Sequence, residues 1–337
     1  MSKKLNVAVV GATGAVGESF LEILASRQFP INKLHALASG REPGRTLVFG
    51  KQNIDVEDLA TFDFKTVDLA FFSAGGKISA EYVPIALAAG CRVIDNTSVF
   101  RMNKDVPLVV PEVNADILKK ETQFVSNPNC STIQLVVALK PLQDKYGIER
   151  VNVSTYQAVS GTGRKAIEEL AKQAVDLFNG HSIESTVYPQ QIAFNVLPHI
   201  DSFESNGYTR EEMKIINETP KILGLKELDV TATAVRVPVF YGHSLSVTVE
   251  LHKNFELAEL RETLKNAPGI ILMDEAESNG YPTPLLQGSG TDAVYVGRVR
   301  RDISHPQAVN LWIVADNVRK GGALNSIQIA ECLLEHT

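Results

Sequence analysis

The chain contains 337 residues, of which 44% are hydrophobic and 21% are charged, so it is long enough for a sizeable core and favours two domains over one. Its net charge of −6 argues against general binding to nucleic acid or to a membrane surface, although it is compatible with a local basic pocket for a small anion. Three scattered cysteines exclude a disulfide framework and a metal cluster, and without a long apolar run or a signal-peptide pattern we expect a cytoplasmic protein with no metal site.

The first expected strand, residues 5–10, leads into a glycine-rich turn at residues 11–17 and then a helical pattern from residue 19. Strand, glycine turn and helix in this order are typical of a dinucleotide-binding domain. Glycines let the backbone approach a pyrophosphate, and the helix start supplies N–H groups to its charge. The spacing Gly-x-x-Gly-x-x-Gly departs from the usual Gly-x-Gly-x-x-Gly, so a turn that only needs positive φ angles is the alternative.

The second expected strand, residues 35–38, ends in Ser39-Gly40-Arg41 with no Asp or Glu at its tip. An acidic residue there would bind the ribose hydroxyls of NAD and repel a 2′-phosphate, whereas Ser39 and Arg41 would accept that phosphate. The tip therefore favours NADP over NAD. The alternative is that Arg41 is simply solvated in its loop.

Further strands are expected at residues 67–72, 91–95 and 124–125, with a helix at residues 79–89. Alternating strands and helices predict an α/β fold with a doubly wound parallel sheet. Ligands bind beyond the carboxyl ends of such strands, so Cys130, just past the last one, is expected near the nicotinamide end of a cofactor. Arg101, beyond another strand end, is either an anion binder or a solvated loop residue. Cys91 opens an apolar strand and is expected in the core.

Cys130 is the candidate nucleophile, because the residues around it indicate a turn that delivers a cysteine to a helix start. Pro128 favours an extended backbone before it, while Asn129 and Ser131 are residue types that hydrogen-bond the unpaired N–H groups of a first helical turn. The field of these groups favours the thiolate, which is the nucleophilic form. A buried cysteine that packs as a small hydrophobe is the alternative.

In the second half, a strand at residues 151–157 leads to a second glycine turn, residues 158–163, and a helix from residue 164. This turn either holds a cofactor from the other side or only reverses the chain. Gln157 either binds a substrate or caps the strand. A later helix begins with a Thr209–Glu212 capping box, and its Glu211 and Lys214 share a face, for which an exposed ion pair is the favoured explanation from sequence alone.

Two strands, residues 231–239 and 243–251, follow this helix. Arg236 is charged within an apolar strand, which is costly unless it meets a partner such as a ligand carboxylate. His243 follows the turn between the strands, where a neutral imidazole could transfer protons; an uninvolved strand histidine is the alternative. A strand at residues 308–315 and a helix from residue 323 to about 334 close the chain, and this helix could fold back on the first domain.

Six motifs occur in order along the chain: GATGAVG, SNPNCST, TYQAVSGTG, EEMK, RVPVFYGHS and GGALNSIQIAE. With these motifs nearly the whole chain resembles the aspartate-β-semialdehyde dehydrogenase family. The resemblance implies reduction of aspartyl 4-phosphate with NADPH to aspartate 4-semialdehyde and phosphate, on the route to lysine, methionine, threonine and isoleucine. It also implies a homodimer, with a Rossmann-type NADP-binding domain at residues 1–128 and 316–337 and an α+β catalytic and dimerisation domain at residues 129–315.

The resemblance further assigns roles to single residues. Cys130 would form an acyl-thioester, and His243 would be the general acid/base. Gln157 would orient the substrate, Arg236 would bind its α-carboxylate and Glu211 its ammonium group. Arg101 and Lys214, with Asn129 nearby, would bind the transferable phosphate. The implied NADP contacts are Gly11, Thr13, Gly14, Ala15, Val16, Gly17, Gly40, Arg41, Ser160, Gly161 and Asn317.

Two alternatives share the fold. An N-acetyl-γ-glutamyl-phosphate reductase would use the same cysteine chemistry, but its substrate has no free ammonium group, so Glu211 argues against it. A non-catalytic NADP-binding homologue would lack the cysteine, so Cys130 in its intact motif argues against that reading.

Overall fold

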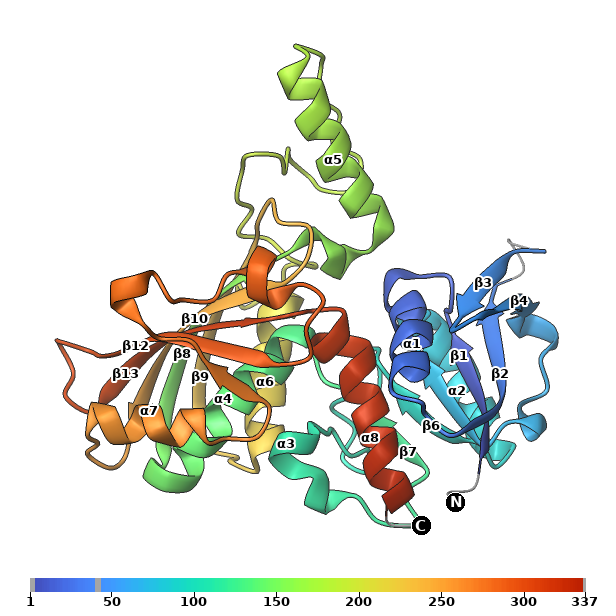
Figure 1. Cartoon of the computed structure of the whole chain (residues 1–337), viewed down its shortest axis with the longest axis horizontal. Helices are drawn as coiled ribbons and strands as arrows, with labels where there is room; N and C mark the ends of the chain where they lie inside the picture. Colours follow the sequence, from blue (N-terminus) through green and yellow to red (C-terminus); the bar gives the residue numbers. More distant parts are fainter. Residues whose placement is uncertain (1–3, 40–43, 336–337) are drawn as a thin grey trace. The chain divides into compact units, whose positions relative to one another are not determined.

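The computed structural model describes residues 4–39 and 44–335. The chain forms two compact units (Figure 1): the first unit is Met1–Pro128 with Gly322–Thr337, and the second unit is Asn129–Gly321. The C-terminal segment therefore returns to the first unit. Residues 316–321, which the sequence analysis assigned to the first domain, belong to the second unit in this division.

The first unit is built on a seven-stranded sheet with the order β3-β4-β2-β1-β5-β6-β7. All neighbouring strands are parallel except β3 and β4, which form an antiparallel hairpin that the sequence analysis did not predict. Because β1 has β2 on one side and β5 on the other, the winding reverses at β1, and the doubly wound α/β fold is confirmed. The strands are β1 (Leu5–Val10), β2 (Ile31–Ala38), β3 (Thr46–Phe49), β4 (Gln52–Asp58), β5 (Leu69–Phe72), β6 (Arg92–Asp95) and β7 (Phe124–Ser126).

Helices cover both faces of this sheet, because its central strands are apolar on both sides. Phe71 and Phe72 are neighbours in β5 and point into different core clusters. Phe71 shares its cluster with Phe20 of α1 and Ile327 of α8, so the C-terminal helix does pack on this sheet. The helices are α1 (Ala15–Ser26), α2 (Gly76–Ala88), α3 (Pro111–Asn114) and α8 (Leu324–Glu335), with single turns η1 (Leu59–Thr61), η2 (Phe64–Thr66) and η3 (Ala115–Ile117).

The second unit is built on a six-stranded sheet with the order β11-β12-β13-β10-β8-β9. Its strands are β8 (Ile148–Gln157), β9 (Asp229–Arg236), β10 (His243–Leu251), β11 (Ile270–Leu272), β12 (Val294–Arg301) and β13 (Ala308–Ala315). In the parallel β8–β9 pair Gln157 lies opposite Arg236, and β10, antiparallel to β8, begins at His243. This register brings three candidate site residues together at the end of the sheet where β8 and β9 finish and β10 begins.

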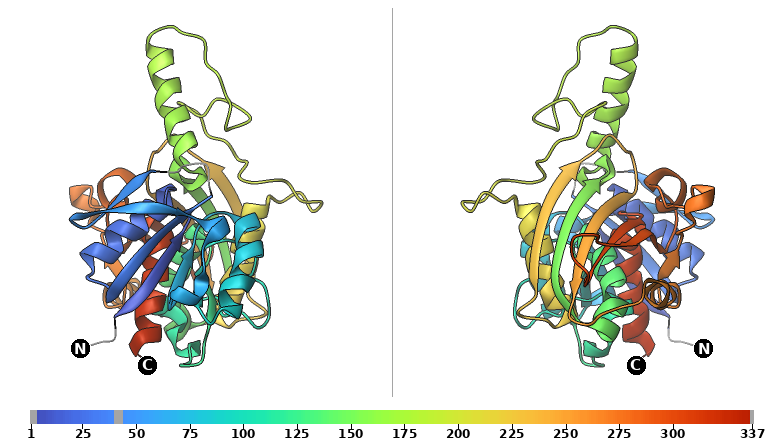
Figure 2. Two further views of the ribbon diagram at one scale, coloured as in Figure 1. Left: turned by 90° about the vertical axis from the view of Figure 1, so that its right-hand side faces the viewer. Right: turned by 90° about the vertical axis from the view of Figure 1, so that its left-hand side faces the viewer.

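Three helices pack together on one face of this sheet (Figure 2): α4 (Cys130–Tyr146), α6 (Arg210–Leu223) and α7 (Leu257–Lys265). On the other face, Tyr156 of β8 and Trp312 of β13 are partly exposed, with ring centroids 5.5 Å apart. The remaining elements of this unit are α5 (Arg164–Phe178) and the turns η4 (Val159–Thr162), η5 (Ala276–Ser278) and η6 (Pro284–Gly288); η7 (Arg319–Ala323) leads to the first unit.

Helix α5 and the chain that returns from it extend away from the sheet of the second unit (Figure 1). This arm, residues 164–209, exposes several large apolar side chains, among them Phe178, Phe194 and Phe203. Within the described residues, no helix combines the length and the apolar character needed to span a bilayer.

Candidate functional site

Cys130 is the first residue of α4, and Asn129 is the N-cap. Asn129 Oδ1 accepts hydrogen bonds from the N–H groups of Ser131 at 3.0 Å and Thr132 at 3.2 Å. The expectation that Ser131 also caps this turn is wrong: it lies inside the helix, and its buried Oγ has no hydrogen-bond partner among the described residues. Cys130 therefore stands at a capped helix start, where the backbone N–H groups favour a negative charge.

Cys130 also differs from the other two cysteines in its surroundings. It is half-buried, and Gly321 lies against it, since a Cβ atom at position 321 would be 2.8 Å from Cys130 Cβ. Cys91 is buried, and burial together with the charge of Asp68 raises its pKa to about 12. Burial and neighbouring glutamates also raise the pKa of Cys332. The expectation that Cys91 belongs to the core is confirmed.

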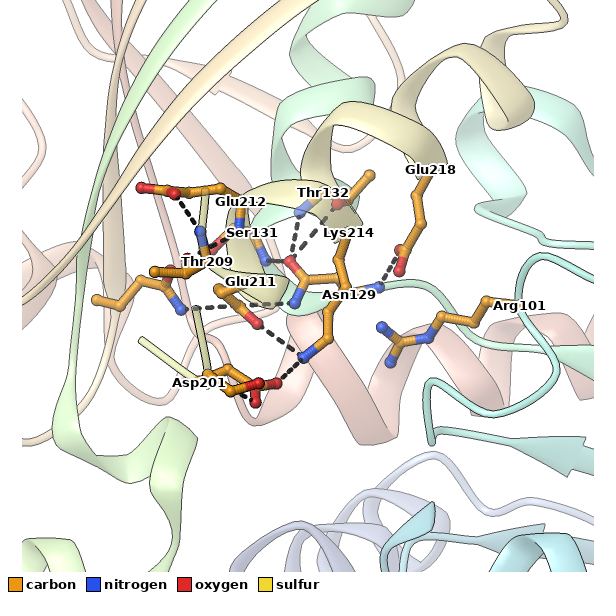
Figure 3. Close-up of polar contacts among 12 residues, drawn as sticks. Arg101, Asn129, Ser131, Thr132, Asp201, Thr209, Glu211, Glu212, Lys214 and Glu218 are labelled. Carbon is orange, nitrogen blue, oxygen red and sulfur yellow. Dashed lines mark hydrogen bonds and ion pairs between the residues drawn. The ribbon is translucent and has the colours of Figure 1, made fainter. Parts of the chain in front are cut away.

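A buried polar network connects Asn129 to α6 and β8 (Figure 3). Glu211 Oε1 accepts hydrogen bonds from Asn129 Nδ2 at 2.8 Å and Gln157 Nε2 at 3.1 Å. Glu211 Oε2 accepts from Lys214 Nζ at 3.0 Å, and Lys214 also donates to Asp201 Oδ2 at 2.9 Å. The exposed ion pair favoured from sequence is wrong in one respect, because Glu211 is buried.

The charges in this network stabilise one another. Burial alone would raise the pKa of Glu211, but the Lys214 ammonium and the hydrogen bonds from Asn129 and Gln157 together hold it below its usual value. Burial would lower the pKa of Lys214, but the carboxylates of Glu211 and Asp201 raise it overall. Both groups are therefore charged at neutral pH, and the site carries a fixed carboxylate and a fixed ammonium.

His243 is fully buried at the start of β10. Burial and the positive charge of Arg236 lower its pKa to about 3, against the opposing effect of Glu211. Its Nδ1 accepts a hydrogen bond from the Ala158 N–H at 3.0 Å, so the neutral ring carries its proton on Nε2. That Nε2 lies 3.4 Å from the Gln157 side-chain nitrogen. The imidazole is thus neutral and held in one tautomer.

Arg236 ends β9 with only 4% of its surface exposed. Its Nη1 donates to the Ala158 carbonyl at 2.6 Å, whereas its buried Nε has no hydrogen-bond partner among the described residues. The guanidinium carbon lies 5.9 Å from the centre of the Tyr188 ring. A buried guanidinium with an unused donor is costly without a ligand, and its planar fork matches a carboxylate.

The second glycine turn packs on these groups. A Cβ atom on Gly161 would lie 3.1 Å from Arg236 Nη1 and 3.3 Å from His243 Nε2, so only glycine fits without displacement. Ser160 Oγ donates to Asn317 Oδ1 at 3.1 Å, and the same oxygen accepts from the Gly242 N–H at 2.9 Å. Asn317 therefore connects this turn to the residue before His243.

In the first unit, the glycine turn fits a dinucleotide. Gly11 has a φ of +87°, and a Cβ atom on Gly17 would lie 2.1 Å from Gly11 O, so these glycines are needed for the turn and its packing. Gly14 is exposed at the N-cap of α1, and its Cβ position meets only Gly11 O at 3.4 Å. The N–H groups of the next helical turn are thus open to a pyrophosphate.

Arg101 also belongs to the first unit, and the alternative of a solvated loop arginine is wrong. It is buried, and it donates from Nε to the Asn127 carbonyl at 2.9 Å and from Nη2 to the Asn96 carbonyl at 2.7 Å. Ser39 is exposed, whereas the predicted cofactor residues Gly40 and Arg41 lie outside the described residues. The second unit contains the other predicted residues outside the first glycine turn: Asn129, Cys130, Gln157, Ser160, Gly161, Glu211, Lys214, Arg236, His243 and Asn317.

Three residues that contact this group were not predicted from the sequence: Asp201, Tyr188 and Glu218. Glu218 is buried in α6, and its Oε2 accepts from the Asn129 N–H at 2.7 Å. One signal for Glu218 was present, because Glu218 and Lys221 repeat the spacing of Glu211 and Lys214 seven residues later. Among the described residues, no group of three or more His, Cys, Asp or Glu could hold a metal ion.

Comparison with known proteins matches both units. Residues 6–121 match the family model "Semialdehyde dehydrogenase, NAD binding domain", and residues 139–320 match "Semialdehyde dehydrogenase, dimerisation domain". The aspartate-semialdehyde dehydrogenase of Legionella pneumophila is 58% identical over 337 residues, covering 99% of this chain and 96% of the relative. That of Shewanella violacea is 53% identical and covers 99% of each chain.

Solved structures of aspartate-semialdehyde dehydrogenases have the same fold as this chain. Aspartate semialdehyde dehydrogenase II of Vibrio cholerae, complexed with ASA, is 50% identical with a TM-score of 0.96 and covers 99% of each chain. The Candida albicans enzyme, solved with NADP, is 25% identical with a TM-score of 0.76 and covers 98% of each chain. The resemblance drawn from the six motifs is confirmed. The chain belongs to the aspartate-semialdehyde dehydrogenase family and is an oxidoreductase that acts on an aldehyde group, in the biosynthesis of the aspartate family of amino acids.

Proposed function

We propose that this chain reduces L-aspartyl 4-phosphate with NADPH to L-aspartate 4-semialdehyde and phosphate through a thioester on Cys130. One observation carries the proposal. Within a single unit, the residue before Cys130 is hydrogen-bonded to Glu211, Glu211 to Gln157, and the Gln157 side chain adjoins the imidazole of His243. A nucleophile, a proton carrier and a fixed pair of charges thus belong to one connected group.

The residues account for the steps. The Cys130 thiolate attacks the acyl carbon, a C–S bond forms, the C–O bond to phosphate breaks and phosphate leaves. The resulting thioester accepts hydride more readily than a carboxylate would, so one difficult step becomes two easier ones. A bound nicotinamide cofactor supplies that hydride. His243 donates a proton to the oxygen that carries the developing charge and recovers it when the aldehyde forms and the thiolate departs.

The charged residues match the ends of the substrate. Arg236, with its unused Nε, would bind the α-carboxylate, and Glu211 the ammonium group. Lys214 and Arg101, with Asn129 nearby, would bind the phosphate. A bound carboxylate would also offset the charge of Arg236, which is one cause of the low pKa of His243, and so move this imidazole toward the range in which it exchanges protons.

Residues 6–121 match a nicotinamide-dinucleotide domain described as "NAD binding", and we infer that the cofactor of this chain is NADP. The turn from Gly11 to Gly17 fits the pyrophosphate, while Ser160, Gly161 and Asn317 form a second group of candidate contacts. No acidic residue ends the second strand, so nothing at its tip, Ser39, repels a 2′-phosphate.

Incubation of the purified chain with aspartate semialdehyde tests the function. We expect NADPH to form only when inorganic phosphate is present, and to form faster from NADP than NADH forms from NAD. The N-acetylated glutamate semialdehyde should react about 10²-fold more slowly or worse, because it leaves the Glu211 charge without an ammonium partner. Absorbance of the reduced cofactor measures each rate. A preference for the N-acetylated aldehyde would overturn the substrate assignment, and phosphate-independent turnover would overturn the acyl-phosphate step.

We also infer a homodimer, since residues 139–320 match a dimerisation domain. Two features of the second unit support it. Tyr156 and Trp312 lie on the sheet face opposite α4, α6 and α7, and Trp312 lines a cavity of about 300 Å³. The arm exposes Phe178 and Phe194. Light scattering should give twice the chain mass at micromolar concentration, whereas a monomer would contradict the inference. A cytoplasmic location stays a prediction.

A further inference from the structure

Glu218 supplies a hydrogen bond that α4 cannot make for itself. In a capping box, the third helical residue accepts a hydrogen bond from the N–H of the N-cap. In α4 that position is Thr132, whose Oγ1 lies 3.5 Å from Asn129 Oδ1 instead. The Asn129 N–H donates to Glu218 Oε2 of α6 at 2.7 Å (Figure 3). A carboxylate from another helix therefore completes the cap that precedes Cys130.

Asn129 is held at two points by one face of α6. Glu211 and Glu218 are seven residues apart, which is close to two helical turns, so they lie on the same face. Glu211 binds the side-chain amide of Asn129 at 2.8 Å, and Glu218 binds its backbone N–H at 2.7 Å. Both carboxylates are buried. Because Asn129 adjoins Cys130, this arrangement fixes the start of α4 relative to α6.

The arrangement places two carboxylates near a helix start, where a negative charge would disfavour a second anion. Each has a lysine three residues later, Lys214 for Glu211 and Lys221 for Glu218. Burial lowers the pKa of Lys221, and the charge of Glu218 opposes that effect, so these two groups interact electrostatically. Glu211 forms an ion pair with Lys214 at 3.0 Å, and Lys221 lies one turn after Glu218 on the same face of α6.

We propose that Glu218 is a positioning residue that sets the place of Cys130 through the Asn129 N–H, and that Lys221 compensates its charge so that the thiolate can form. The proposal rests on the proposed function in which Cys130 is the nucleophile. In the proposed mechanism Glu218 itself contacts neither substrate nor cofactor. Its effect should therefore fall on kcat and on the reactivity of the thiol, and little on substrate affinity.

Glu218→Ala should lower kcat about 10- to 100-fold, because small misplacements of a reacting group cost that much, while the KM for aspartate semialdehyde changes less than about 3-fold. Glu218→Gln keeps an acceptor oxygen and should restore most of kcat. Lys221→Met removes the cation that lies one helical turn after Glu218, so the midpoint of the pH dependence of Cys130 alkylation by iodoacetamide should move upward. Mass spectrometry of the Cys130 peptide measures that midpoint.

Glu212→Ala is the matched control. Glu212 lies on the same helix, is similarly buried and also accepts from backbone N–H groups, those of Thr209 at 2.7 Å and Ala234 at 2.9 Å. The Glu212→Ala variant should have a lower melting temperature but an unchanged midpoint for the pH dependence of Cys130 alkylation. If Glu218→Ala fails to fold, Glu218→Gln and Lys221→Met still carry the test. Unchanged kcat in Glu218→Ala, or an unchanged midpoint in Lys221→Met, would overturn the proposal; turnover by Cys130→Ala would instead overturn the proposed function.

Discussion

Cys130→Ala should reduce phosphate-dependent oxidation of aspartate semialdehyde about 10⁴-fold or more and leave NADP binding intact. The reason is that no other described side chain at this helix start can form the thioester, so the reaction loses its covalent route. Cofactor binding should persist because Cys130 is not among the proposed cofactor contacts and the glycine turn of residues 11–17 lies in the other unit. Steady-state rates measure the loss, and titration with NADPH followed by fluorescence measures the binding.

Cys332→Ala is the control for this experiment. Cys332 is also half-buried, but burial and nearby glutamates raise its pKa, so it holds little thiolate at neutral pH. We expect its removal to leave the rate within about 2-fold of wild type, as for an ordinary substitution away from the site. Substantial turnover by Cys130→Ala would defeat the mechanism, and loss of NADPH binding would show that the substitution damages the fold.

His243→Asn should lower kcat by about 10²- to 10⁴-fold, the usual contribution of a general acid/base. Asparagine can keep an acceptor for the Ala158 N–H, which donates to His243 Nδ1 at 3.0 Å, but it cannot exchange a proton. The variant therefore separates proton transfer from the structural hydrogen bond. Steady-state kinetics over a range of pH measure the effect, and a kcat close to wild type would contradict the assignment.

The same variant has an expected effect on stability. The pKa of His243 is lowered from 6.5 to about 3, mainly by burial, so below pH 6.5 the unfolded chain binds a proton that the folded protein does not. The stability contributed by the neutral imidazole is thus complete above pH 6.5 and is lost as the pH falls toward about 3. Between about pH 7 and about pH 5, wild type should lose more stability in urea unfolding than His243→Asn.

His305→Asn provides the comparison for the effect on kcat. His305 lies in an exposed loop, so its substitution should leave kcat within about 2-fold of wild type. A wild-type protein whose urea midpoint changes no more than that of His243→Asn over this range would show that His243 is not held neutral by the fold.

Most of the fold could be predicted from local sequence patterns. The turn from Gly11 to Gly17 predicted a dinucleotide-binding unit, because a positive φ and a close backbone approach leave no other residue type possible at Gly11 and Gly17. Asn129 predicted the start of α4, because capping is a contact between neighbours in sequence. The β3–β4 hairpin escaped notice, since its short strands are only partly buried.

The candidate site could be predicted only in part from the sequence. The sequence marked Cys130, Arg236 and His243 as chemically unusual, yet it left a structural alternative open for Cys130 and for His243. The register of β8, β9 and β10 brought Gln157, Arg236 and His243 together at the end of the sheet where β8 and β9 finish and β10 begins. Strand pairing between segments far apart in the chain depends on the whole core, so no local pattern encodes it.

The sequence by itself determined the family and marked the candidate residues for its chemistry, because residue type and local spacing decide those properties. Only the tertiary structure decided the environment of each group. Burial beside Arg236 is what keeps His243 neutral, and packing of α6 on α4 is what lets Glu218 bind the Asn129 N–H. A pKa and a long-range hydrogen bond depend on distances in space, which spacing along the chain does not fix.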